Sequence, residues 1–298
     1  MKSYQTYRIE TEHNGLTVEG YLKQILRYSG RKIQKLTRKK GILLNKKPVI
    51  LQKKVRTGDI IRILLLEDQS YGVEPQEGSI DILFEDSQLI ILNKPPRMLV
   101  HPAGHTSGGT LANYLAHYFQ EQGVVFTIRP LHRLDRDTSG CVVFAKDALS
   151  QTILERQMST GDFQRTYVAI VNGRLEPQIG TLDFPIGKHP TLPNRRSVQE
   201  QGETAVTHYK VIQFLSELSL LELKLETGRT HQIRVHLAHI GNPVIGDTMY
   251  GKSCPMISRQ ALHAESVTFT HPRNRTQITV QAPLPADFST IIGKLKRP

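Results

Sequence analysis

The densest group of polar side chains in the sequence lies at residues 132–140, HRLDRDTSG, directly before the apolar run CVVF. A loop beside a strand is where such groups can converge on a ligand. A carboxylate in this setting can act as a nucleophile or as a general base while it is ionised, and a nearby cation favours that form by holding its pKa down. Asp135, at the centre of the loop, is therefore the first candidate for chemistry.

The same loop permits two other interpretations. Its acidic and polar residues match the first positions of a calcium-binding EF-hand loop, but Lys146 stands where that loop needs a glutamate. A strand rather than a helix is also expected to follow. A polar turn stabilised by its own Asp and Ser side chains is the second alternative, and the loop by itself does not exclude it.

The histidines and cysteines do not form a metal-binding pattern. His231, His236 and His239 are spaced by five and three residues, unlike the paired histidines of a zinc-binding helix. Cys141 and Cys254 are too far apart in sequence for a metal-ligand pair, so we expect no metal. The sequence also lacks a glycine-rich turn of the dinucleotide-binding type. This argues against a methyltransferase with a nucleotide-like cofactor, and we expect no cofactor.

Several motifs, in one order, resemble the RluA family of pseudouridine synthases over most of residues 80–284. They are NKPP at 93–96, HRLDRDTSG at 132–140, RTY at 165–167, TGRTHQIRVH at 227–236 and HA at 263–264. The resemblance implies an isomerase that acts on uridine in RNA. Such an enzyme breaks the bond between the sugar and the ring nitrogen, rotates the base and rejoins it through carbon five, without a cofactor.

The resemblance also implies roles for three side chains. Asp135 matches the family's essential aspartate, and Arg234 matches the arginine that pairs with it, since a guanidinium can bind a carboxylate while staying charged. Tyr167 matches the tyrosine that accepts or relays the proton leaving carbon five. From the residues alone, Tyr167 would be read as a core aromatic of a strand. Covalent attack and proton abstraction by Asp135 both remain open.

Four further side chains are expected to bind the substrate. A uridine within RNA must swing out of its stack to expose its sugar–base bond. By resemblance, Arg133 is placed to fill the vacated space and stack on neighbouring bases, with an ordinary phosphate contact as the alternative. His132, His231 and Gln232 are the other binding residues expected in the catalytic part of the chain.

The positive charge of the chain is concentrated in residues 22–62. The whole chain carries a net charge of +12, whereas this segment has 14 Lys and Arg residues against one acid, so it carries +13 and the remainder −1. Such a concentration suits a phosphate backbone, although a solvated lysine-rich face is the alternative. With its motifs GILLNKK and VRTGDIIRI, the segment resembles the S-four RNA-binding module. Lys35, Arg38 and Lys39 are the candidate RNA-binding residues.

Hydrophobic spacing and turn signals divide the chain into three parts. We expect a small α+β RNA-binding module at residues 1–70, a linker at 71–79 and a catalytic domain at 80–298. In the module, apolar residues recur at helical spacing at 22–26 and again at 33–36, so two short helices are expected there, followed by strands at 41–45 and at the end of 55–61. In the catalytic part several strands follow one another without a helix between them. This predicts an α+β fold with a mixed, largely antiparallel sheet.

Location and partners follow from the same features. No apolar run approaches the roughly 20 residues that cross a bilayer, and the first residues lack a secretory signal, so we expect a cytoplasmic protein with no membrane partner. We expect a monomer that binds RNA. Large-subunit ribosomal RNA is the expected substrate, transfer RNA is the alternative, and a non-catalytic ribosome-assembly protein is the competing function.

Overall fold

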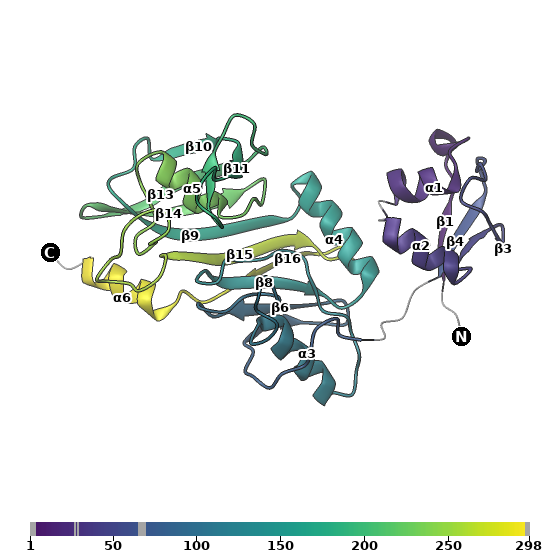
Figure 1. The fold of residues 1–298 in the computed structure, drawn as a ribbon, viewed down its shortest axis with the longest axis horizontal. Coiled ribbons are helices and arrows are strands. Elements are labelled where there is room, and N and C mark those ends of the chain that lie inside the picture. The colour runs from purple at the N-terminus through teal and green to yellow at the C-terminus, as the bar shows by residue number, and fades with distance from the viewer. Residues whose placement is uncertain (1–3, 27, 29, 65–69, 296–298) are drawn as a thin grey trace. The chain divides into compact units, whose positions relative to one another are not determined.

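The computed structural model describes residues 4–26, 28, 30–64 and 70–295 (Figure 1). The chain divides into two compact units, residues 1–68 and 69–298. Each unit has its own hydrophobic core, so each can be understood from its own sequence.

The first unit is a four-stranded antiparallel sheet covered by short helices. Its strand order is β1-β4-β2-β3, with β1 at Tyr4–Arg8, β2 at Ile42–Leu44, β3 at Lys47–Pro48 and β4 at Ile60–Leu64. Its helices are η1 at Thr11–His13, α1 at Val18–Gly20, a π-helical turn η2 at Tyr21–Ile25, and α2 at Gly30–Arg38. The two helical stretches and the strands β2 and β4 match the predicted ones, whereas β1 and β3 were not predicted.

A ten-stranded sheet forms the second unit. Its main path runs β10-β13-β14-β9-β15-β8-β6-β5, with β16 paired to β15 and β7 paired to β8. The strands are β5 (Ile82–Glu85), β6 (Leu89–Lys94), β7 (Arg129–Pro130), β8 (Ser139–Ala145), β9 (Gln164–Asn172), β10 (Ile179–Asp183), β13 (Val206–Leu215), β14 (Leu218–Leu225), β15 (Leu262–Thr270) and β16 (Gln277–Gln281). A separate hairpin is made of β11 (Ile186–Lys188) and β12 (Arg196–Val198).

One parallel pair joins the two halves of the large sheet, since β8 and β15 run in the same direction and every other pair is antiparallel. The pairing is formed by the last two residues of the polar loop motif, Ser139 and Gly140, opposite His263 and Ala264. Gly140 makes it possible, because a Cβ at this position would lie 2.1 Å from the carbonyl oxygen of Ala264 and its φ is +112°. The predicted mixed, largely antiparallel α+β fold is therefore confirmed.

Four helices pack against the sheet: α3 (Leu111–Glu121), α4 (Ala148–Thr160), α5 (Gln232–His239) and α6 (Ala286–Leu295). Apolar side chains of α3, α5 and α6 share one core with the sheet, and Leu154 of α4 belongs to a second core with Phe163 and Phe269. Figure 1 shows α3 beside β6 and α5 beside β13 and β14. Thr110 caps α3 with a reciprocal capping box, and Asp147 caps α4 through two backbone N–H groups.

Residues 71–79, expected as a linker, make hydrogen bonds within the second unit. The side chain of Asn113 on α3 donates to the carbonyl of Glu74, and the backbone N–H of Gln76 donates to the carbonyl of Asn113. The backbone N–H of Ile128 donates to the carbonyl of Tyr71. By these contacts the segment belongs to the second unit. No helix in the described ranges is long and apolar enough to span a membrane.

Candidate active site

A cleft of about 530 Å³ opens in the second unit beside the polar loop. Its walls come from the loop at 131–138, from β9, from the end of α4 and from the segment leading into α5. Asp135, Tyr167 and Arg234 all line this cleft, although they stand on three different elements. The structure therefore brings the three side chains named by the sequence motifs to one place.

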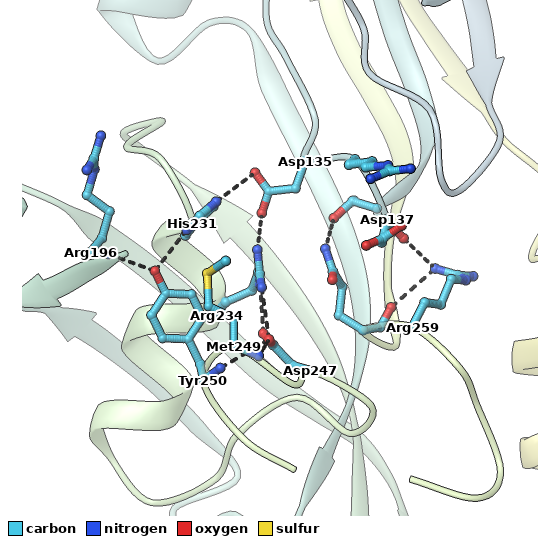
Figure 2. A network of polar contacts seen from close by, with 12 residues as sticks. Asp135, Asp137, Arg196, His231, Arg234, Asp247, Met249, Tyr250 and Arg259 are labelled. Carbon is cyan, nitrogen blue, oxygen red and sulfur yellow. Dashed lines mark hydrogen bonds and ion pairs between the residues drawn. The ribbon is translucent and has the colours of Figure 1, made fainter. Parts of the chain in front are cut away.

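Asp135 is held by a chain of charges that ends in the protein interior (Figure 2). Nη1 of Arg234 donates to Oδ2 of Asp135 at 2.9 Å. The other side of the same guanidinium donates to Asp247, from Nε at 2.6 Å and from Nη2 at 2.8 Å. Asp135 is 19% exposed and Asp247 only 1%, so one carboxylate faces the cleft while the other anchors the arginine.

The guanidinium of Arg234 stays protonated in this arrangement. Burial alone would lower its pKa, but the hydrogen bonds and charge of Asp247, with the charge of Asp135, raise the pKa above its ordinary value. Asp247 is itself fixed, because its Oδ1 also accepts the backbone N–H groups of Met249 at 3.0 Å and Tyr250 at 3.2 Å. Two rigid hydrogen bonds thus aim Nη1 at Asp135.

His231 stands on the other side of Asp135. Its Nε2 lies 3.9 Å from Oδ1 of Asp135, and its Nδ1 lies 2.8 Å from the hydroxyl of Tyr250. That hydroxyl accepts the backbone N–H of Arg196, so we assign its own proton to His231 Nδ1. Burial lowers the pKa of His231, partly offset by the charge of Asp135. The neutral ring therefore presents its Nε2–H to the carboxylate.

Lys94, a residue of the NKPP segment, ties that segment to the polar loop. It is fully buried, and its Nζ donates to the carbonyls of Pro95 at 2.7 Å, Met98 at 2.8 Å and Arg136 at 3.0 Å. Arg259 acts similarly, since it donates to the carbonyl of Asp137 at 3.1 Å and forms two hydrogen bonds with Asp287 of α6. The backbone that directly follows Asp135 is thus held by two buried basic side chains.

Tyr167 lies on β9 with its ring almost fully buried. Burial raises its pKa, and the charge of Asp135 raises it further against the opposing effect of Arg165. In the free enzyme the phenol is therefore protonated at neutral pH. Within the described part of the chain its hydroxyl has no hydrogen-bond partner, which leaves it available to a ligand in the cleft.

The other predicted binding residues have different surroundings. Arg133 is exposed at the mouth of the cleft, without a protein partner in the described ranges. His132 lies in the floor, where burial lowers its pKa to about 3. Gln232 lines the cleft, but its amide already bonds to the protein: it donates to Val206 and Thr207 and accepts from Thr227 and Arg229. Its observed contacts hold the segment before α5.

Lys35, Arg38 and Lys39 are on α2 or directly after it in the first unit. Ile33 and Leu36 of this helix are buried, whereas the three basic side chains are exposed and line a shallow hollow with Gln34. Their charge is therefore accessible to a polyanion. Across the described ranges, no group of three or more His, Cys, Asp or Glu side chains could hold a metal ion.

Sequence reasoning missed Asp247, Tyr250 and Arg259. Asp247 follows the apolar run PVIG, and an acid in such a run is a signal for a buried charge that needs a partner. Arg259 and Tyr250 gave no comparable signal, because their contacts depend on segments distant in sequence. Lys94 was noticed as part of NKPP, but its role could be seen only in the structure.

Comparisons with known proteins agree with this geometry. A family described as RNA pseudouridylate synthase matches residues 88–239, and one described as RluD ribosomal pseudouridine synthase N-terminal domain matches residues 6–61. The chain is 42% identical to an uncharacterized RNA pseudouridine synthase, YhcT, of Bacillus subtilis, over 95% of this chain and 94% of that protein.

Another relative and a solved structure extend the comparison. The chain is 36% identical to ribosomal large subunit pseudouridine synthase D of Escherichia coli K12, over 90% of this chain and 87% of that protein. Human RNA pseudouridylate synthase domain containing 4 shares the fold, with a TM-score of 0.60 at 23% identity over 72% of this chain and 93% of that one. The predicted family and enzyme class are confirmed. The chain belongs to the RNA pseudouridylate synthase family and is an isomerase of uridine in RNA.

Proposed function

We propose that this enzyme converts uridine to pseudouridine in large-subunit ribosomal RNA, with Asp135 as the catalytic carboxylate. The observation that carries the catalytic part is the partly exposed carboxylate of Asp135, held by Arg234 at the edge of a cleft that can receive one nucleotide. The ribosomal substrate is supported by the relatives from Escherichia coli and Nitrosomonas europaea, which are named ribosomal large subunit pseudouridine synthase D.

In this proposal each side chain has one task. The Asp135 carboxylate either attacks the sugar or removes a sugar proton as the bond to the ring nitrogen breaks. Arg234 and the Nε2–H of His231 keep that carboxylate oriented and its negative charge stabilised. Tyr167 relays the proton that leaves carbon five after the base is rejoined. Arg133 occupies the space of the everted nucleotide in the RNA.

The first unit supplies affinity rather than chemistry. The exposed basic side chains of α2 are proposed to bind phosphates of a structured RNA, which position the target without reading its sequence. A ribosomal substrate agrees with the predicted cytoplasmic location. The monomeric state and the absence of a cofactor stay predictions.

Two measurements test the proposal together. Pseudouridine is mapped across the transcriptome with and without the gene, and the purified enzyme is incubated with the RNA so identified, without any added cofactor. We expect the loss of a defined site in large-subunit ribosomal RNA and its restoration in vitro. A site confined to transfer RNA would contradict the substrate, and a product that requires a methyl donor would contradict the reaction.

A further inference from the structure

Arg165 is a buried cation that has no counterion among the residues described by the structure. Its side chain lies on β9, is only 7% exposed and lines the cleft. In the part of the chain that the structure describes, no carboxylate oxygen forms an ion pair with its guanidinium. Its hydrogen bonding there consists of a long contact from Nη2 to the carbonyl of Thr227 at 3.4 Å, and its Nε has no partner. A buried charge so poorly compensated is costly unless a ligand completes its environment.

The neighbouring side chain of His132 also has a buried N–H without an acceptor among the described residues. His132, which is 9% exposed, accepts the backbone N–H of Val143 at its Nε2 at 3.4 Å. The neutral ring therefore carries its proton on Nδ1, and this buried N–H has no acceptor among the described residues. Among the described residues His132 therefore offers no acceptor to Arg165, because its Nε2 accepts from Val143 and its Nδ1 carries the proton.

The carboxylates of the cleft are engaged elsewhere. Asp135 binds Arg234, Glu226 lies 2.6 Å from His208, and Glu155 accepts from Gln151 at 2.8 Å. Arg229, the other arginine of this wall, already forms an ion pair with Glu203. Arg165 is therefore the buried charge of the cleft that none of these carboxylates neutralises, whereas Arg133, which also has no protein partner in the described ranges, is exposed to solvent.

Gly228 makes room for this guanidinium. A Cβ at Gly228 would lie 2.9 Å from Nη1 of Arg165, so any side chain there would push the guanidinium aside. The backbone of the segment entering α5 and the planar cation thus lie in close contact. This arrangement keeps Nη1 of Arg165 at the cleft, where no acceptor from the described residues binds it.

We propose that Arg165 binds a backbone phosphate of the RNA next to the nucleotide held in the cleft. A phosphodiester neutralises the guanidinium, which a neutral uracil carbonyl does not. Arg165 and Tyr167 are two residues apart on the same face of β9, about 7 Å along a strand. A phosphate adjoining the everted nucleotide is within that reach. The inference rests on the proposed function and names an additional contact of the same site.

The test uses a short synthetic RNA that contains the mapped uridine. Each phosphate within two nucleotides of the target is replaced in turn by a neutral methylphosphonate. The sugar on its 5′ side carries a 2′-O-methyl group, which a matched phosphodiester control also carries. The full-length wild type, Arg165→Met and the control variant Arg229→Met are compared by kcat/KM, and thermal melting verifies that each is folded.

One phosphate should stand out. For wild type and Arg229→Met, its neutralisation should lower kcat/KM by about 10- to 100-fold, the effect of removing one charge-assisted hydrogen bond. Arg165→Met should show that decrease already on unmodified RNA and fall less than about twofold further on neutralisation. If Arg165→Met does not fold, Gly228→Ala replaces it, and its sensitivity at the same phosphate should be reduced.

The outcomes separate this inference from the proposed function. If wild type converts the RNA but neutralisation lowers the activity of wild type and the Arg165 or Gly228 variant equally at every phosphate, the phosphate site is wrong while the function stands. If wild type does not convert the RNA at all, the proposed function fails and the phosphate site fails with it.

Discussion

Asp247 and Arg234 form a bidentate ion pair, with hydrogen bonds of 2.6 Å and 2.8 Å. This pair leaves Nη1 of the arginine directed at Asp135. The pair is almost fully buried, whereas Asp135 faces the cleft. The orientation of the proposed catalytic carboxylate is thus fixed by a buried acid that does not line the cleft.

This relationship predicts the effect of Asp247→Asn. Asparagine cannot accept at both positions, so Arg234 would lose its fixed direction and part of its buried compensation. We expect kcat to fall by about 10- to 100-fold with KM changed little, and the free energy of unfolding to fall by about 3 kcal/mol. Glu203→Gln, which breaks the exposed pair with Arg229, should cost less than about 1 kcal/mol. Wild-type kcat in Asp247→Asn would contradict the positioning role.

Tyr167→Phe removes the hydroxyl and keeps the ring, so it separates the contributions of the two. The ring packs in the core, and within the described part of the chain the hydroxyl makes no hydrogen bond that phenylalanine would lose. We expect unchanged thermal stability and a kcat lower by about 10²- to 10⁴-fold, because a positioned proton-transfer group is removed. Turnover with RNA under single-turnover conditions measures the effect. A fully active Tyr167→Phe enzyme would leave the tyrosine with a packing role only.

Much of the site could be predicted because the sequence motifs carry it. Asp135, Tyr167 and Arg234 lie on a loop, a strand and a helix whose local patterns were readable, and the cleft joins them. The partner of Asp247 was not predictable, since an isolated acid indicates a buried cation without indicating which one. The strands β10, β11 and β12 were missed because short, partly exposed strands carry little alternation.

Lys94 gives the protein a pH-dependent component of stability. Burial lowers its pKa to about 7, well below the ordinary value of lysine near 10.5, so between these values the unfolded chain binds a proton that the folded chain does not. This component therefore raises stability as pH rises from about 7 to 10, by up to about 1.4 kcal/mol per pH unit. Below about pH 7 both states are charged and the full cost of burial remains.

Lys94→Met should remove that slope. Unfolding by denaturant at about pH 7, 8 and 9 compares the two proteins, and the difference between their unfolding free energies should change with pH by the amount above. Lys294→Met, on the exposed side of α6, is the matched control and should keep the wild-type slope. Parallel curves for wild type and Lys94→Met would show that Lys94 does not titrate in this range.

The basic face of α2 should control the salt dependence of RNA binding. Replacing Lys35, Arg38 and Lys39 together by glutamine should weaken binding and reduce the slope of log K against log salt by about 0.9 for each phosphate that the variant no longer neutralises. The control replaces exposed lysines of the second unit, Lys210, Lys224 and Lys294, by glutamine, with the same change in net charge. Equal slopes for the two triple variants would argue against a specific role for α2.

The most direct measurement is pseudouridine formation by Asp135→Asn under single-turnover conditions, with RNA affinity measured in parallel. Asparagine keeps the size of the side chain but can neither attack the sugar nor take its proton as a carboxylate. We predict RNA binding within about threefold of wild type and no detectable pseudouridine, a decrease in rate of at least about 10⁴-fold. Product formed at a rate near that of wild type would contradict a catalytic role for Asp135.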